Sequence, residues 1–482
     1  MQTAGLFILG IYLLIMVSIG VLAARFQKST TDFWVAGRGF GAFVLAVAIM
    51  ASIMHGGTMV GGTGQIAAMG AITLNNLSFA LGFLVVLFFM AEKLRNFGGF
   101  TLPDFLGERY ESNSMRAFSA FVILVTATVS LIAQTKSMGI IVQNMTGLSP
   151  EFSLILATAI FVFYTTIGGM MAAVWTDIVQ WAFMMLGVIA LSVGLLPHIG
   201  GFSAAAQAAE KAAPGWTALT GIGWTPLSLF SWYFVWFIAY FTRIEFVTKM
   251  YTARDARAAR LGTAWGLILI LLFINFMVYF GAAARVLIWD KIKSPDQALP
   301  ALMATYLSPF WAAVALSGVA AAAMSTVSSL LLLSGAAISH DFLRKSYFEP
   351  KGIHKSEGYY LAISRLTLLA VGLIALLGAF KTPTLVLTIV SYAVALSGAA
   401  FAMPMLLGLV WRRTSPAAAL ASSIGGFLGS AFWAIATEMG YAWAKVMHPI
   451  IPGFVISLIL ILTVSLFTPP SSKETLQKFF PA

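Results

Sequence analysis

The sequence predicts an all-α integral membrane protein, and its composition carries most of that prediction. Of the 482 residues, 60% are hydrophobic and only 9% are charged, whereas a soluble globular chain is about 25% charged. A water-soluble domain could not bury this much apolar surface. The chain has no cysteine, which excludes disulfide scaffolds and thiolate metal sites. Its net charge of +11 therefore indicates membrane topology rather than nucleic-acid binding.

Apolar runs bounded by glycine, proline or charged residues predict 13 transmembrane helices. They lie near residues 5–25, 40–69, 73–92, 118–142, 151–168, 175–197, 226–248, 261–287, 309–339, 360–380, 384–411, 415–440 and 448–468. The first run is too long for the core of a signal peptide and no basic segment precedes it, so we interpret it as an uncleaved span. No linker or low-complexity tract divides the chain, and residues 1–482 are expected to form a single transmembrane domain.

Basic residues are distributed unevenly over the predicted loops. With the N-terminus outside, 20 of the 28 Lys and Arg lie in inside segments and 6 in outside segments, while Lys136 and Arg243 fall within spans. The positive-inside rule therefore predicts an external N-terminus. Since the number of spans is odd, the C-terminus is then cytoplasmic, in a multi-pass protein of the inner or plasma membrane.

The second span contains an irregular, glycine-rich segment. Five glycines fall within residues 56–64, and each costs a helix interior about 1 kcal/mol relative to alanine. This pattern predicts an unwound stretch, whose free backbone groups could coordinate a ligand. Close packing of helices through small residues is the alternative. His55, which lies within the same segment, favours the break.

The ninth span carries hydroxyl groups along one helical face. Ala322, Ser325, Thr326 and Ser329 follow the spacing i, i+3, i+4, i+7. Neutral oxygen ligands suit a monovalent cation such as sodium, since a divalent ion would demand more negative charge. The alternative is that these hydroxyls bond to their own helix or join neighbouring helices.

Three charged residues of the sixth and seventh spans fall within the apolar band. Asp177 could ligate a cation or relay a proton, or it could cap the start of the sixth helix together with Thr176. Arg243 and Glu245 are two residues apart and do not face each other on a helix. We expect each of them to pair elsewhere or to reach towards the membrane surface.

Two further groups suggest contacts with an organic solute. Trp236 and Tyr240 are four residues apart, share a helical face, and could form a wall of a substrate pocket, although packing alone would produce the same pattern. Lys136, with Gln134 nearby, could hold a substrate carboxylate. It could equally extend to the outer surface, about two turns away.

Several motifs, in this order, resemble those of the sodium:solute symporter family, which includes bacterial proline and pantothenate symporters. The motifs are residues 32–38 (DFWVAGR), 164–169 (YTTIGG), 175–180 (WTDIVQ), 251–255 (YTARD), 296–300 (DQALP), 323–326 (AMST) and 391–401 (SYAVALSGAAF). The ordered set covers nearly the whole chain and is far more specific than any one motif.

The resemblance implies a fold of the LeuT type, which is a five-helix inverted repeat with an extra N-terminal helix. The extra helix would be residues 5–25, the first repeat about 40–197, the second about 226–411, and the C-terminal helices about 415–468. Each repeat would begin with a broken helix. The residues themselves indicate the first break but not the second, and no internal sequence repeat is evident.

The resemblance also implies site residues. Sodium site one would use Ala51, Met54, Ala322, Ser325 and Thr326, and a second sodium site would use Asp177, Ser325, Ser328 and Ser329. Substrate would contact Ile53, His55, Gly56, Gly57, Thr58, Gln134, Lys136, Trp236 and Tyr240. The coupling ion is thus Na+, with one or two ions per cycle.

The first break departs from the family's proline and sugar symporters. Proline symporters have Asp and Ser where this chain has Ile53 and His55, so transport of proline or galactose is not implied. His55 adds a hydrogen-bond donor that could be charged at mildly acidic pH. Together with Lys136, it favours a small carboxylate or amino acid as the substrate.

The expected function is therefore sodium-coupled symport of a small organic solute by alternating access, in contact with the lipid bilayer and with no nucleic-acid partner. A monomer would suffice. Proton coupling in the same fold, with Asp177 or His55 as carrier, is the alternative, as is a non-transporting membrane sensor. An enzyme is not expected, since the chain has five histidines and no His/acid spacing typical of a metal site.

Overall fold

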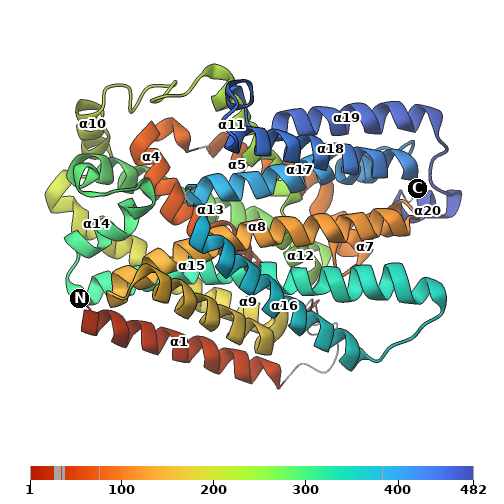
Figure 1. Ribbon diagram of the computed structural model, residues 1–482, viewed down its shortest axis with the longest axis horizontal. Helices are drawn as coiled ribbons and strands as arrows, with labels where there is room; N and C mark the ends of the chain where they lie inside the picture. Colours follow the sequence, from red (N-terminus) through yellow and green to blue (C-terminus); the bar gives the residue numbers. More distant parts are fainter. Residues whose placement is uncertain (1, 26–33, 35–37, 75, 383, 481–482) are drawn as a thin grey trace.

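The computed structural model describes residues 2–25, 34, 38–74, 76–382 and 384–480, and these are almost entirely helical (Figure 1). The α-helices are α1 (Gln2–Ala24), α3 (Ala42–Ile53), α4 (Thr63–Met69), α5 (Asn76–Val85), α6 (Ala91–Phe97), α7 (Leu102–Arg109), α8 (Asn113–Thr146), α9 (Pro150–Ile199), α10 (Phe202–Ala212), α11 (Pro226–Thr242), α12 (Ile244–Thr252), α13 (Ala256–Leu287), α14 (Ala298–Tyr306), α15 (Pro309–Ala336), α16 (Glu357–Lys381), α17 (Val386–Val410), α18 (Pro416–Glu438), α19 (Ile450–Phe467) and α20 (Lys473–Phe479). An isolated parallel β-bridge joins Phe40 to Ala253.

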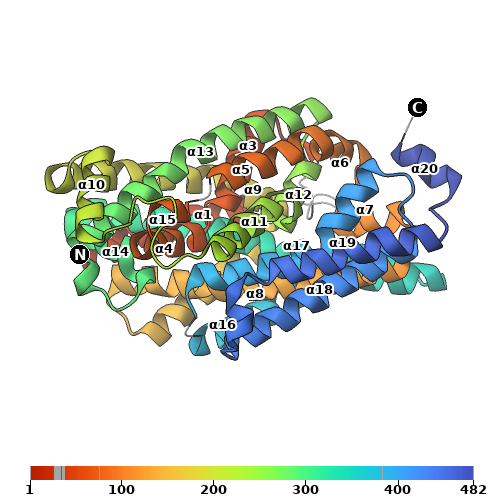
Figure 2. The same cartoon turned by 90° about the horizontal axis from the view of Figure 1, so that it is seen from above.

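The long helices run side by side along the longest axis of the molecule (Figures 1 and 2). Among the described residues, 11 helices are long and apolar enough to cross a membrane, or 12 if the bent pair Ala42–Ile53 and Gly57–Met69 counts as one span. The prediction of 13 transmembrane helices is therefore not confirmed by this number. Helix α1 starts at one end of the molecule and α20 lies at the other (Figure 1), so the described chain begins and finishes on opposite faces.

The fifth and sixth predicted spans run together in α9, which is kinked at Gly169. The backbone of Gly169 has φ 57° and ψ −164°, a region open essentially to glycine alone. The second arm of α9 therefore starts well before residue 175, where the sequence analysis placed it. The alternative that Asp177 caps this helix is wrong, because Asp177 lies inside the arm and several residues beyond the kink.

Helix α15 is the centre of the fold. Residues 312–336 are all buried, which is typical of a helix that is apolar on every side and surrounded by other helices. It packs against α8, α9 and α1. Small residues allow close approach, since a Cβ at Gly318 would lie 2.5 Å from the Phe183 carbonyl oxygen. The outer helices instead expose large apolar side chains such as Leu14 of α1 and Leu373 of α16, as a lipid-facing surface requires.

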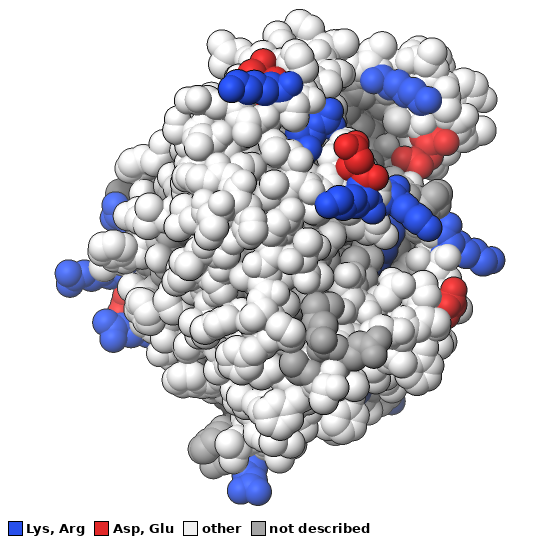
Figure 3. Space-filling view, turned by 90° about the vertical axis from the view of Figure 1, so that its left-hand side faces the viewer, with Lys and Arg blue, Asp and Glu red and all other residues white. Residues whose placement is uncertain are grey.

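One end of the molecule, at the left of Figure 1, is seen face-on in Figure 3. Uncharged atoms cover most of this face, and Lys/Arg and Asp/Glu side chains occur together near part of its edge. This face therefore carries charges of both signs rather than a basic patch.

Two helices are broken part-way along their length. Helix α3 ends at Ile53, and the chain bends by 55° before the next helical segment begins at Gly57, which confirms the predicted break. A second break separates α11 from α12 at Arg243, whose φ of −65° and ψ of 124° are extended. The residues alone did not indicate this second break.

The glycines of the second span have a different role from the expected one. Residues 57–62 form a π-helical turn that leads into α4, so the irregular stretch is confined to residues 54–56. A Cβ at Gly61 would lie 2.8 Å from the Leu387 Cβ, and one at Gly64 would collide with the Pro295 carbonyl. These two glycines therefore let α17 and the loop before α14 approach the broken helix closely.

Hydroxyl and carboxylate side chains cap many helix starts. The residues that accept a backbone N–H at an N-cap include Ser112, Ser149, Thr225, Asp255, Ser356 and Ser415. Such caps satisfy backbone donors that a helix leaves free at its first turn, and they define where long apolar helices begin.

Replacing Gly169 with alanine tests the kink of α9. The Gly169→Ala substitution should cost about 1–3 kcal/mol, because a Cβ is strained at this φ and ψ, and should lower the melting temperature of the purified protein. Gly10→Ala is the matched control, since a Cβ there meets nothing within 4 Å. Equal melting temperatures for the two variants would contradict a strained kink.

Candidate functional site

The first break is joined directly to α15. The Ser325 Oγ donates at 2.8 Å to the carbonyl of Ala51 and at 2.9 Å to that of Ala322. The Thr326 Oγ1 donates at 3.2 Å to the carbonyl of Ser52. All of these residues are fully buried. Neutral oxygens from two helices thus converge at the end of α3, an arrangement that suits a monovalent cation.

Met54, the other predicted backbone ligand, lies at the break itself. Its N–H still donates to the carbonyl of Met50, at 2.8 Å. Its φ of −79° and ψ of 59° are not helical, so its own carbonyl no longer points along α3. The predicted residues of sodium site one therefore lie around one junction between α3 and α15.

Asp177 of α9 forms an ion pair with Lys249 of α12, and both side chains are completely buried. The sequence analysis assigned Lys249 to an inside loop. Its side chain instead neutralises the carboxylate that was predicted for a second sodium site. The Asp177 Oδ1 is buried without a hydrogen bond among the described residues.

The remaining hydroxyls predicted for the second sodium site bond within their own helix. The Ser328 Oγ donates to the carbonyls of Met324 and Ser325, at 3.2 and 3.0 Å, and the Ser329 Oγ donates to that of Ser325 at 3.3 Å. This is the back-bonding alternative considered above. Ser325 and Thr326 bond to carbonyls of α3, whereas Ser328 and Ser329 back-bond within α15 and Ser328 also bonds to Tyr164 of α9.

His55 organises the backbone of the first break. Its Nδ1 accepts the Thr58 N–H at 3.2 Å and lies 3.3 Å from the Gln134 Nε2, and its Nε2 lies 3.3 Å from the Thr58 Oγ1. Because Nδ1 accepts a backbone N–H, it carries no proton, and the ring is neutral. The Thr58 Oγ1 in turn donates to the Ile53 carbonyl at 2.9 Å. His55 thus closes a local network rather than offering a positive charge.

Arg243 and Glu245 pair with each other at the second break. The Arg243 Nε donates to the Glu245 Oε1 at 2.6 Å, and the two residues are 4% and 5% exposed. The expectation that each pairs elsewhere was wrong. It assumed a continuous helix, whereas the extended backbone of Arg243 turns the two side chains towards each other.

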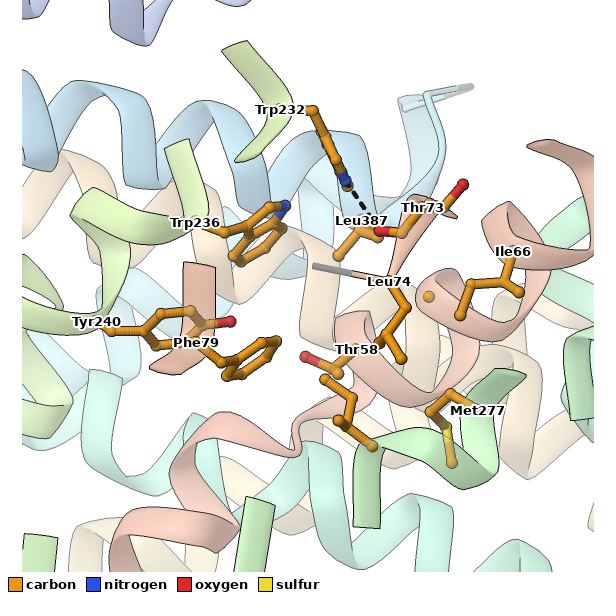
Figure 4. A pocket seen from close by; sticks show the side chains of 12 residues that line it. Thr58, Ile66, Thr73, Leu74, Phe79, Trp232, Trp236, Tyr240, Met277 and Leu387 are labelled. Carbon is orange, nitrogen blue, oxygen red and sulfur yellow. Dashed lines mark hydrogen bonds between the residues drawn. The ribbon is translucent and has the colours of Figure 1, made fainter. Parts of the chain in front are cut away.

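An aromatic cavity of about 40 Å³ lies beside the first break (Figure 4). Trp232, Trp236 and Tyr240 of α11 and Phe79 of α5 line it, together with Thr58. Tyr240 stacks on Phe79 with ring centroids 4.1 Å apart, and Trp232 meets Trp236 edge-on at 5.5 Å. The Trp232 Nε1 donates to the Thr73 carbonyl at 3.2 Å. The cavity offers aromatic faces to an apolar group.

Three of the predicted substrate residues, Thr58, Trp236 and Tyr240, line this cavity. The others lie outside its lining. The buried residues Ile53, His55, Gly56 and Gly57 form the backbone turn of the break, and Gln134 contacts His55. The structure therefore separates the predicted set into a cavity wall and a supporting layer.

Lys136 lies away from the cavity, near the loop that precedes α17. Its Nζ donates to the Thr384 carbonyl at 2.7 Å and lies 3.8 Å from the Asp296 Oδ2. Burial raises the pKa of Asp296, and the Val386 N–H, which donates to it at 3.1 Å, and Lys136 lower it only in part. Lys136 therefore joins loops, in line with the alternative that it extends to the surface.

A second buried cluster, absent from the sequence analysis, joins α7 to the π-helical segment that follows α15. Asp104, His340 and Asp341 offer ligand atoms within 4.8 Å of one another. The His340 Nε2 lies 3.1 Å from the Asp104 Oδ2. Burial acts to raise the pKa of Asp104, but His340, the Phe100 N–H and Arg116 outweigh it and lower that pKa. Over 230 residues separate the partners in sequence, so no motif spacing could have revealed the cluster.

These features are typical of a multi-pass transporter, with two broken helices and an aromatic cavity beside the first of them. The chain belongs to the sodium:solute symporter family, whose model matches residues 33–426. It is accordingly a sodium-coupled symporter for a small organic solute. Residues 32, 33 and 35–37 of the first family motif lie outside the described residues.

The chain is similar over nearly its full length to transporters of known kind. It is 29% identical to an osmoregulated proline transporter of Bacillus subtilis, covering 98% of this chain and 96% of the relative. It is 30% identical to a sodium/proline symporter of Salmonella typhimurium, covering 95% and 91%. Both relatives are transporters.

Solved structures share the fold. A Na+-coupled sialic acid symporter in a substrate-bound outward-open state superposes with a TM-score of 0.83 at 16% identity, covering 97% of this chain and 98% of that one. A nucleobase-cation-symport-1 family transporter superposes with a TM-score of 0.58 at 14% identity. At these identities the likeness concerns the fold alone.

The ion pair between Asp177 and Lys249 should show in a double-mutant cycle. Asp177→Asn or Lys249→Met alone leaves a buried charge without its partner and should cost about 3–5 kcal/mol, whereas the double variant should recover most of that loss. Melting temperatures of the purified variants provide the measurement.

The surface pair formed by Arg260 and Glu92, at 3.5 Å, is the control for this cycle. Arg260→Met or Glu92→Gln should change stability by less than about 1 kcal/mol, because exposed pairs contribute little. Additive losses in the Asp177/Lys249 double variant would contradict direct pairing.

Proposed function

We propose that the protein imports a small carboxylic or amino acid together with sodium by alternating access. The observation that carries the proposal is the hydrogen bonding of Ser325 and Thr326 of α15 to the carbonyls of Ala51 and Ser52 at the end of α3. Sodium held by these oxygens, with Ala322 and Met54 completing the set, would join the broken helix to the central helix. Ion binding would thereby set the position of the broken helix.

The solute would bind beside this junction. Thr58, Trp236 and Tyr240 line the cavity next to the first break, and His55 connects Thr58 to Gln134. In the proposed cycle, sodium from outside favours an outward-open form, and the solute then binds against the aromatic faces. Closure and inward opening follow, and low internal sodium drives release.

We propose one sodium ion per cycle. Lys249 already supplies a positive charge at Asp177, and Ser328 and Ser329 bond within their own helix, so the second sodium site of the sequence analysis has no free anion. One charge moving across 100 mV contributes about 2.3 kcal/mol, which a single coupled sodium would supply.

Proton coupling is less well supported than sodium coupling. Both carriers considered for it, Asp177 and His55, are already bonded to partners within the protein. Lys249 stabilises the Asp177 carboxylate, and the Thr58 N–H occupies the His55 Nδ1.

We propose 13 spans with the N-terminus outside and the C-terminus cytoplasmic. The bent pair as one span and the two arms of α9 as two would bring the number of crossings to 13. The distribution of Lys and Arg, 19 inside and 6 outside once Lys249 is counted within a span, and the charges of both signs at the face in Figure 3 support this orientation. The inverted repeats would be residues 40–197 and 226–411, each beginning with one of the two breaks, within a single domain.

Relatives described as proline transporters make proline and other small apolar amino acids the first solutes to examine. The aromatic cavity suits an apolar side chain or ring of this size. Ile53 and His55 at the first break, and Arg243 and Glu245 at the second, are expected to decide which of these acids is taken.

Ser325→Ala tests the sodium site. Loss of one oxygen ligand should raise the sodium concentration for half-maximal uptake about tenfold or more, as measured with reconstituted protein in liposomes. Ser334→Ala is the matched control, since this buried serine of α15 donates to the Leu330 carbonyl in its own helix. Unchanged sodium dependence in Ser325→Ala would refute the assignment.

The sodium number can be measured directly. Parallel fluxes of labelled sodium and solute into liposomes should give a ratio of one, with a Hill coefficient for sodium near one, because Lys249 neutralises Asp177. A ratio of two, or uptake driven by a proton gradient without sodium, would contradict this part of the proposal.

A further inference from the structure

The guanidinium of Arg243 has a free donor in the middle of the protein. Its Nε and Nη2 are directed at the Glu245 Oε1, whereas its Nη1 is buried without a hydrogen bond among the described residues. A buried, unpaired N–H of a charged group is costly. A residue kept in this state is therefore a candidate for binding a partner from outside the chain.

Arg243 borders a small cavity of about 20 Å³, enough for one or two water molecules, which polar and apolar residues line together. We call it the polar cavity. Arg243 and Glu245 line it from the second break, Thr126 and Ser130 from α8, and Ser397 from α17. A cavity with two opposite charges and hydroxyl groups can recognise a polar headgroup.

The polar cavity and the aromatic cavity share no lining residue, but one chain segment borders both of them. Tyr240, which lines the aromatic cavity, precedes Arg243 by three residues, and the Arg243 N–H still bonds to the Ala239 carbonyl at 2.9 Å. Residues three apart on a helix are neighbours on its surface. A solute with a polar head and a small apolar group could therefore reach Arg243 and the aromatic rings together.

We propose that Arg243 and Glu245 recognise a zwitterionic α-amino acid, with the carboxylate on the Arg243 Nη1, the ammonium on Glu245, and the side chain against Trp236 and Tyr240. The inference rests on the proposed transport function and names the class of its solute.

The two opposite charges at the site select a zwitterion over a simple anion. Arg243 and Glu245 are together neutral. The nearby pair formed by Lys249 of α12 and Asp177 of α9 is neutral as well. His55 adds no charge, because its Nδ1 accepts an N–H. A simple anion would face the Glu245 carboxylate and give it no partner, whereas a zwitterion gives both Arg243 and Glu245 an ion of opposite charge.

This assignment moves solute recognition from the first break to the second. Lys136 and His55, which the sequence analysis favoured for a carboxylate, are bonded to the Thr384 carbonyl and to Thr58. Arg243 is the buried cation of this region whose guanidinium keeps a free N–H among the described residues.

The test uses the full chain, purified and in liposomes, with two matched sets of probes in saturating sodium. The first set is L-proline, L-prolinamide and cyclopentanecarboxylate, and the second is L-valine, L-valinamide and isovalerate. Within each set the apolar group is constant and only the carboxylate or the ammonium is removed. We expect the amino acid of at least one set to raise the melting temperature and to be taken up, and both of its analogues to bind at least about 100-fold more weakly.

The variant Arg243→Gln/Glu245→Gln removes both charges without leaving one of them unpaired. It should keep the sodium-induced rise in melting temperature and lose affinity for the amino acid by at least about 100-fold. If the double variant fails to fold, Arg243→Lys replaces it in the test. This variant keeps the charge but not the fork of donors, and it should raise the KM for the amino acid. Glu92→Gln/Arg260→Gln, at an exposed pair, should leave binding unchanged.

Three results would overturn the inference. The first is that cyclopentanecarboxylate or isovalerate binds as tightly as the amino acid. The second is that Arg243→Gln/Glu245→Gln or Arg243→Lys leaves the affinity for the amino acid unchanged. The third is that the protein responds to none of the 20 common amino acids. Sodium-dependent uptake of another solute in these cases would leave the proposed function intact. Absence of sodium-dependent uptake of any solute would instead refute the proposed function itself.

Discussion

The structure depends on one constraint, which is that every charge and every backbone group freed inside the apolar core needs a partner from the protein. Breaking two helices half-way across this core frees such groups. At the first break the hydroxyls of Ser325 and Thr326 and the ring of His55 take them up. At the second break the extended backbone of Arg243 brings its side chain onto Glu245. The breaks therefore exist only where other helices surround them.

Helix α12 shows how the same constraint organises charge. It carries Glu245 and Lys249, one turn apart, and each is paired with a residue outside that helix, Arg243 just before it and Asp177 of α9. Helix α12 is thus neutral overall, although it carries two charged residues. Such an element can shift within the core without carrying net charge into lipid, as a moving part of an alternating-access transporter must.

The proposed ion site and the proposed solute cavity lie on either side of the short irregular stretch of residues 54–56. On one side the last turn of α3 meets α15 through the Ala51 and Ser52 carbonyls. On the other side His55 holds Thr58 at the cavity wall. Sodium and solute would therefore act on one short backbone segment. Helix α15, which is buried from residue 312 to residue 336, would give that segment a reference, and under the proposed function this geometry would let binding of one species favour the other.

The sequence by itself determined a multi-span α-helical membrane protein, because its composition and its long apolar runs are local properties of the chain. The ordered motifs, by resemblance, indicated the symporter family. The sequence also identified the first break, from His55 among glycines, and the hydroxyl face of α15. The tertiary structure alone decided which charges meet. Lys249 looked like a loop residue until α12 placed it on Asp177, and Arg243 with Glu245 looked unpaired until the backbone was seen to break between α11 and α12. The energy of each ion pair depends on the distance between two residues that are far apart in the chain, or on one local backbone angle. Neither quantity can be read directly from the sequence.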